Sequence, residues 1–205
     1  MKRFLNCKID LSRKVFRPRI ETEYLTGKAI KELKNKEINV LDVFSGTGCI
    51  GIALLKNIEK AKVDFADISE EALKEVRINL KLNKIKKERT KVIKSDLFKG
   101  LGRKKYDIVF ANPPYVALER ISEVDEEVLK NDPKIALFAG RTGMVYIKSF
   151  LNQIKSHLKN KGIFYLEFDP FQKKEIKEIL RKKDFKISFK KDQFEKIRWL
   201  KAENI

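Results

Sequence analysis

The segment IVFANPPYV, residues 108–116, ends an apolar run at one asparagine and two prolines. The side-chain oxygen of Asn112 and the backbone carbonyl of Pro113 are acceptors that could each take one N–H of a planar NH₂ group. Such contacts would aim the nitrogen lone pair at an electrophile and stabilise the positive charge that grows on nitrogen. Pro113 and Pro114 restrict the loop, and Tyr115 could stack on the planar group. The segment therefore favours group transfer to an amino or amide nitrogen.

A glycine-containing turn follows another apolar run, VLDVF. Gly46 and Gly48 lie where a strand is expected to turn into a helix, so the backbone can approach a ligand beside free helical N–H groups. Asp42 adds a carboxylate next to this turn, and local carboxylates in a basic chain favour a cationic ligand. A tight structural turn remains the alternative for the glycines taken alone.

Two aspartates end the next two predicted strands. Asp67 lies 19 positions beyond Gly48 and could accept both hydroxyls of a ribose. A helix cap is the alternative, but Ser69 is better placed for capping. Asp96 could accept a hydrogen bond from an adenine amino group while Leu97 packs on the ring, although an aspartate often simply begins a loop. Together with the glycines, these strand ends indicate an adenosine-containing ligand.

The glycine pattern distinguishes among adenosine cofactors. A pyrophosphate cofactor favours a full GxGxxG, whereas Phe44 stands where many such loops have their first glycine. S-adenosylmethionine carries an ammonium and a sulfonium, which suit the nearby carboxylates. The sequence thus predicts methyl transfer from S-adenosylmethionine, with S-adenosylhomocysteine as product. Glutamine, adenine, guanine and cytosine all carry a planar NH₂, and the NPPY motif does not choose among them.

The pattern of apolar runs predicts the elements that would position these motifs. Strands are expected at residues 38–44, 62–68, 90–96, 106–112 and 162–168, and helices at 48–58, 69–83, 141–160 and 170–182. Two further strands, near 184–190 and 194–201, are expected to form a hairpin. This alternation predicts one α/β domain with a mostly parallel sheet covered on both faces. In such sheets ligands bind at the carboxyl ends of the strands, near the point where strand order reverses.

Composition limits the class of protein. A chain of 205 residues with 42% apolar content can bury one sizeable core. It has no apolar run of about 18 residues and no secretory signal, so a cytoplasmic protein is expected. Cys7 and Cys49 have neither disulfide-framework nor metal-site spacing, and no metal is expected. The formal net charge of +18 comes from lysines scattered over every predicted helix, so a nucleic-acid partner is possible but not favoured.

Flanking segments narrow the choice of substrate. RPRIETEYL at residues 17–25 and DPKIALFAGRTGM at 132–144 enclose the glycine, aspartate and NPPY motifs. In this order and spacing they resemble the glutamine methyltransferases that modify peptide chain release factors, whose first motif reads PRPETE. The resemblance runs from about Phe4 to Leu200. Ile20, Phe44 and Ala139 depart from the family pattern, but NPPY is intact.

The resemblance implies a seven-stranded, Rossmann-like methyltransferase sheet with an antiparallel C-terminal edge at 183–201, and a release factor as partner. Candidate catalytic residues are Asn112, Pro113, Pro114 and Tyr115. Candidate cofactor-binding residues are Asp42, Phe44, Ser45, Gly46, Thr47, Gly48, Asp67, Asp96, Leu97 and Asn112. The family's first motif implies substrate-adjacent positions at Arg19, Glu21, Thr22 and Glu23.

The resemblance also divides the chain. Residues 1–18 are expected to form an N-terminal hairpin or arm, with the hairpin in FLNCKIDLSRKVF, and residues 19–205 the methyltransferase domain. The helical domain that helps family members dock their protein substrate is not expected within this chain. Residues 116–143 are expected to cover the substrate as a lid. Glutamine methylation of a ribosomal protein, or amino methylation of a base in rRNA, tRNA or DNA, remains an alternative because the same core would serve.

Overall fold

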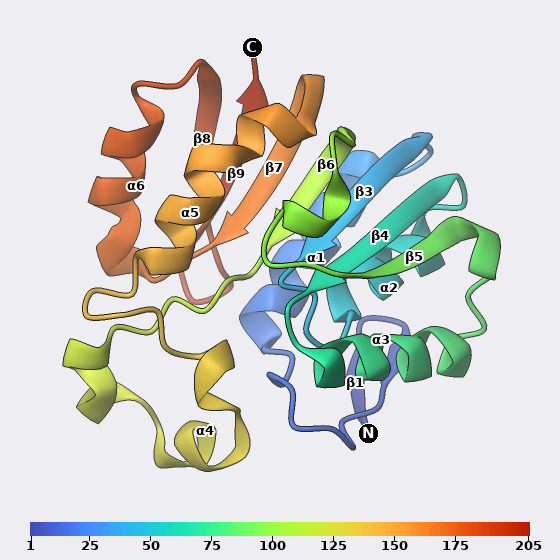
Figure 1. Ribbon diagram of the computed structural model, residues 1–205, viewed down its shortest axis with the longest axis horizontal. Helices are drawn as coiled ribbons and strands as arrows, with labels where there is room; N and C mark the ends of the chain where they lie inside the picture. Colours follow the sequence, from blue (N-terminus) through green and yellow to red (C-terminus); the bar gives the residue numbers. More distant parts are fainter.

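A seven-stranded sheet dominates the computed structural model, which describes residues 1–205 (Figure 1). The strand order is β5-β4-β3-β6-β7-β9-β8. The strands are β3 Ile38–Val43, β4 Ala61–Asp67, β5 Thr90–Lys94, β6 Tyr106–Ala111, β7 Leu158–Glu167, β8 Phe185–Lys191 and β9 Ile197–Asn204. The first five are parallel to one another, and β9 is antiparallel to both β7 and β8. This confirms the predicted Rossmann-like sheet and its antiparallel C-terminal edge.

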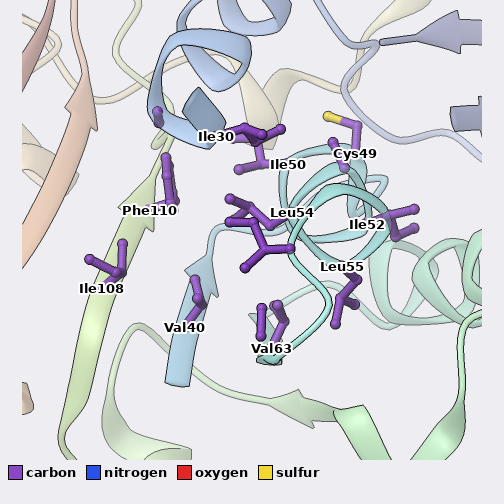
Figure 2. Packing of buried hydrophobic residues seen from close by; sticks show 14 of the residues in the cluster. Ile30, Val40, Cys49, Ile50, Ile52, Leu54, Leu55, Val63, Ile108 and Phe110 are labelled. Carbon is purple, nitrogen blue, oxygen red and sulfur yellow. The ribbon is translucent and has the colours of Figure 1, made fainter. Parts of the chain in front are cut away.

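Helices cover both faces of the sheet. The helices of one face are α1 Ile20–Leu33, α2 Cys49–Asn57 and α3 Glu70–Leu82, and those of the other are α5 Val145–Gln153 and α6 Lys173–Leu180 (Figure 1). Each face has its own cluster of buried apolar side chains. In Figure 2, α2 presents Ile50 and Leu54 to the space between α1 and strands β3 and β6. Full burial of such a side chain is worth about 1.5–3 kcal/mol, so the packing of α2 fixes the end of β3.

Two helical expectations needed correction. Helix α1 was not expected, yet Leu25, Ala29 and Leu33 recur at helical spacing and are buried against the sheet. The helix expected over 141–160 begins only at Val145 and ends at Gln153, and a 3₁₀ turn then leads directly into β7. Two glycine positions in the left-handed region, at 140 and 143, hold the chain in a turn just before α5.

The N-terminal hairpin lies earlier than expected. Its strands are β1 Lys2–Phe4 and β2 Cys7–Ile9, and three of its side chains are buried in the cluster that also holds α1 and α2. Asn79 of α3 and Asn83, which caps the C-terminus of that helix, accept hydrogen bonds from the backbone N–H of Asp10 and Lys8, at 2.7 and 3.0 Å. These bonds direct the following segment, residues 10–19 (the arm), across the carboxyl ends of the strands.

The segment expected to act as a lid, residues 116–143 (called the lid below), has secondary structure of its own. It contains the short helix α4 Glu126–Asn131 and two 3₁₀ turns, and Val116 forms an isolated parallel bridge with Phe138. Both cysteines are free. No helix is long and apolar enough to cross a membrane, and no group of three or more His, Cys, Asp or Glu side chains is placed to hold a metal ion.

Candidate active site

A cavity of about 370 Å³ opens at the carboxyl ends of β3, β4 and β6. Strand order reverses between β3 and β6, so this is where a ligand is expected in an open α/β sheet. The predicted site residues that line the cavity are Arg19, Thr22, Phe44, Ser45, Gly46, Thr47, Asp67, Asp96, Leu97, Asn112, Pro113, Pro114 and Tyr115. Lining residues that sequence reasoning did not single out include Val15, Phe16, Ile68, Tyr146 and Ser149.

The turn after β3 bends sharply before α2 begins. Phe44, Gly46 and Gly48 have φ angles of +60°, +53° and +76°. Gly48 donates its N–H to the Ser45 carbonyl at 2.7 Å, and a Cβ added at Gly48 would lie 3.1 Å from Val76. Glycine is thus needed at position 48 for both conformation and space. Phenylalanine at position 44 is strained, as residues at ligand-binding turns often are.

Asp67 fixes this turn from the neighbouring strand. Its Oδ2 accepts the Gly46 N–H and its Oδ1 accepts the Ser69 N–H, both at 2.9 Å. Burial raises the pKa of Asp67, while these backbone bonds oppose the shift. Ser69, and not Asp67, caps the next helix, because its Oγ accepts the Ala72 N–H at the start of α3. Asp67 is therefore left with lone pairs toward the cavity, where hydroxyl groups could donate.

The turn after β5 is also constrained. Ser95 Oγ accepts the Gly100 N–H at 2.9 Å, and Leu97 is buried with a φ of +55°. Asp96 is exposed and forms an ion pair with Lys99 at 2.5 Å. Leu97 thus offers an apolar surface to the cavity, and Asp96 stands at its rim.

Asn112 is oriented by a hydrogen-bond chain. Its Nδ2 lies 3.5 Å from Thr22 Oγ1, which in turn donates to Glu167 Oε2 at 2.8 Å. When Glu167 is ionised it only accepts, so the single hydroxyl hydrogen of Thr22 goes to Glu167 and Thr22 accepts from Asn112. The Asn112 Oδ1 is consequently left as a free acceptor beside Pro113.

Glu167 also holds Tyr115. The Tyr115 hydroxyl donates to Glu167 Oε1 at 3.1 Å, and Glu167 is 1% exposed. Burial raises the pKa of Glu167 from 4.5 to about 7, although the bonds from Thr22 and Tyr115 oppose the shift. Sequence reasoning gave Glu167 no role. The only indication of this role in the sequence is that Glu167 is an acidic residue near the end of the otherwise apolar segment GIFYLEF.

Gln172 and Asp132 tie the lid to the rest of the site. Gln172 Nε2 donates to the backbone carbonyls of Tyr115 and Gly143, at 2.9 and 3.0 Å. Asp132 is buried; its Oδ1 accepts the Arg17 N–H at 2.9 Å and its Oδ2 pairs with the Arg19 guanidinium. The NPPY loop, the arm and the lid are thus joined through these two side chains.

Four predicted site residues do not line the cavity. Asp42 is 1% exposed, its Oδ2 accepts the Gly51 N–H of α2 at 2.9 Å, and burial raises its pKa to about 8. Gly48 is the N-cap residue that directly precedes α2. Glu21 and Glu23 lie on α1 away from the cavity, and Glu23 accepts the Leu5 N–H at 2.5 Å.

Comparison with known proteins agrees with this fold. Residues 26–160 match the family model described as the methyltransferase small domain. A methyltransferase structure from Pyrococcus furiosus superimposes with a TM-score of 0.71 at 17% identity, over 98% of this chain and 91% of that one. That likeness shows the fold alone. The fold and the family match together define a methyltransferase.

Sequence relatives are more specific. The release factor glutamine methyltransferase of Lactococcus lactis is 32% identical over 98% of this chain and 73% of the relative. That of Streptococcus pneumoniae is 35% identical over 93% of this chain and 68% of the relative. The chain therefore belongs to the release factor glutamine methyltransferase family.

Proposed function

We propose that this methyltransferase transfers a methyl group from S-adenosylmethionine to the side-chain amide nitrogen of a glutamine in a peptide chain release factor. The names of the relatives support this substrate, and the intact NPPY motif supports a planar NH₂ acceptor. A glutamine of a ribosomal protein, or an amino group of a base, would be served by the same core. A cytoplasmic location follows from a substrate that acts in translation.

The residues that line the cavity support S-adenosylmethionine as the cofactor. S-adenosylmethionine supplies an electrophilic methyl group on a positively charged sulfur. Asp67 would accept the ribose hydroxyls, Leu97 and Ile68 would pack on the adenine, and Asp96 would accept from its amino group. The remaining contacts would come from the turn at 44–47. Burial of the Asp67 carboxyl disfavours its ionisation, and a bound cation would offset that cost.

The acceptor nitrogen would be held by protein oxygens. Asn112 Oδ1 and the Pro113 carbonyl would each accept one N–H, which directs the nitrogen lone pair away from both. The same two oxygens face the positive charge that develops on nitrogen as it attacks. Tyr115 would cover the planar amide, with its hydroxyl fixed by Glu167. The amide loses its extra proton after attack, so no general base is needed beforehand.

The orientation of Asn112 by Thr22 and Glu167 is the observation that carries the proposal, because it leaves Oδ1 as the acceptor. Methyl incorporation from labelled S-adenosylmethionine tests it. Purified release factor would be compared with the same factor carrying alanine at its catalytic glutamine, and with total RNA. Label on the intact factor alone, lost with the Asn112→Ala enzyme, is the expected result. Label on RNA, or on the alanine-carrying factor, would contradict it.

A further inference from the structure

Phe171 is a large aromatic residue that remains 76% exposed beside the candidate active site. It lies in a 3₁₀ turn, Pro170–Gln172, that follows the carboxyl end of β7. Gln172 of this turn donates to the Tyr115 carbonyl at 2.9 Å, so the turn contacts the NPPY loop directly. The capping box of the turn is made by Asp169 and Gln172 and does not use the Phe171 ring. The local fold therefore gives no reason for an aromatic side chain at position 171.

Arg120 of the lid holds this ring in place. Its guanidinium carbon lies 3.8 Å from the centroid of the Phe171 ring, in a cation–π contact. The same guanidinium donates to Glu123 Oε1 at 2.9 Å and to Asp169 Oδ1 at 3.3 Å. Arg120 is thus fixed on both sides and covers one face of the ring. A ring that is ordered before binding loses little conformational freedom when a partner covers its exposed surface.

Two further apolar side chains continue this surface to the mouth of the cavity. Leu118 lies in the same 3₁₀ segment as Arg120, and its N–H donates to the Gly140 carbonyl at 3.0 Å. Gly140 approaches Val145 so closely that an added Cβ would lie 2.7 Å from Val145 Cγ2. Leu118 and Val145 are both exposed, and Val145 also lines the active-site cavity. Phe171, Leu118 and Val145 (the rim patch) therefore lead from the lid to the cavity.

The position and chemistry of the rim patch favour a protein chain as its partner. In Figure 1 the lid lies beyond the N-terminal ends of α5 and α6, at the end of the sheet where β6 and β7 stop. A large substrate that inserts an amide into the cavity from this end must contact its rim. Nucleic acids bind chiefly through their phosphates, but Arg120 and Arg141 are already paired with Glu123 and Glu119. Exposed apolar side chains instead gain free energy when apolar groups of a protein cover them.

We propose that the rim patch docks the protein chain that carries the acceptor glutamine, by contact with apolar residues around that glutamine in the folded release factor. The inference rests on the proposed function and deepens it, because it assigns substrate binding to a surface outside the cavity. Phe171 is the anchor, and Leu118 and Val145 extend the contact. Phe171 and Leu118 do not line the cavity, so they contribute to substrate affinity and not to the chemical step.

Steady-state kinetics of release-factor methylation test the rim patch. The double variant Leu118→Ser/Phe171→Ser should raise the KM for the factor by about tenfold or more, as the loss of an aromatic anchor at an interface commonly does. The kcat and the KM for S-adenosylmethionine should stay unchanged, because binding lost equally from the ground and transition states leaves kcat as it was. Phe171→Leu keeps part of the apolar surface and should raise the KM for the factor less than Phe171→Ser.

Leu82→Ser/Ile205→Ser is the matched control. Leu82 ends α3, and Ile205 follows β9, which runs antiparallel to β7, so both residues lie at the opposite end of the sheet from the rim patch. Ile205 is 76% exposed, as Phe171 is. The KM for the factor should change by less than about twofold in this control, as for surface substitutions away from a binding site. Circular dichroism of both double variants would verify that the fold is intact.

The possible failures are distinct. A native enzyme that leaves the release factor unlabelled would overturn the proposed function, and this inference with it. Labelling by the native enzyme, with an unchanged KM for the factor in Leu118→Ser/Phe171→Ser, would overturn the rim patch alone. Equal increases of KM in both double variants would mean that general surface hydrophobicity binds the factor. A lower kcat with an unchanged KM would show that Phe171 orders the NPPY loop instead of docking the substrate.

Discussion

Thr22 Oγ1 lies 2.8 Å from Glu167 Oε2, although 145 positions separate the two residues in the sequence. The bond is buried and joins the first turn of α1 to the last residue of β7. Because Asn112 and Tyr115 contact the two ends of this bond, one buried carboxylate positions both polar side chains of the NPPY loop. The NPPY loop is therefore held by two elements that are remote from it in the chain.

The hydroxyl of Thr22 should matter more than its shape. Thr22→Val keeps the volume but removes the acceptor for Asn112 and the donor to Glu167. We expect kcat to fall by about tenfold, as for loss of one to two buried hydrogen bonds, with the KM for S-adenosylmethionine little changed. Thr22→Ser keeps the hydroxyl and should retain most activity. Equal loss in the two variants would show that methyl packing, not the hydrogen bond, is what the site needs.

Glu167 should make stability depend on pH. Its pKa is about 7 in the folded protein against an ordinary 4.5, so the folded state binds the proton more tightly. The contribution of Glu167 to the free energy of unfolding is fully present below about pH 4.5 and is lost as pH rises through about 7. The full decrease in the free energy of unfolding is about 3 kcal/mol. Glu167→Gln cannot ionise. We expect urea unfolding at pH 5 and pH 8 to show that the free energy of unfolding of the variant rises relative to that of the native chain at the higher pH.

A pH-independent difference between Glu167→Gln and the native chain would contradict this expectation. The comparison is needed because Asp42 also has a raised pKa, about 8, and contributes a pH dependence of the same sign. Both forms retain Asp42, so its effect cancels in the difference.

Asp67 should be the main determinant of cofactor affinity. Asp67→Asn leaves one oxygen where the carboxylate has two, so either the Gly46 or the Ser69 N–H loses its acceptor. We expect S-adenosylmethionine to bind at least about tenfold more weakly by calorimetry. Asp96→Asn is the matched control, since Asp96 is exposed and an amide oxygen still accepts; a change below about threefold is expected. A larger loss at Asp96 would reverse the two assigned roles.

The sequence predicted the parallel strands well because each apolar run ends in polar, chemically distinctive residues. It did not place Asp42 correctly relative to the cavity. Along β3, Val40 and Asp42 share one face and Leu41 and Val43 the other, so the alternation directs Asp42 beneath α2. A residue beside a ligand-binding turn in sequence can therefore lie on the far side of it. The role of Glu167 was missed because its two hydrogen-bond partners, Thr22 and Tyr115, come from segments that are distant in the sequence.

Helix α1 was missed because its buried face includes hydroxyl groups. Thr22 and Thr26 lie on that face with the apolar residues, and they interrupt the apolar spacing. Both are buried, yet Thr26 bonds to the Thr22 carbonyl and Thr22 to Glu167. Their hydrogen bonds offset the cost of burying polar groups, which no periodicity in the sequence reveals.

Arg19 should hold the lid against the arm. It pairs with Asp132, which is buried and follows α4 directly, and its guanidinium also lies 4.8 Å from the Phe16 ring. Arg19→Ala would leave the Asp132 carboxylate with only the Arg17 N–H as partner, a costly arrangement for a buried charge. We expect faster proteolytic cleavage within 116–131 and a KM for the protein substrate raised by about tenfold. Arg19→Ala/Asp132→Asn removes the unpaired charge and should recover part of both losses. If the double variant is no better than Arg19→Ala, the ion pair is not what secures the lid.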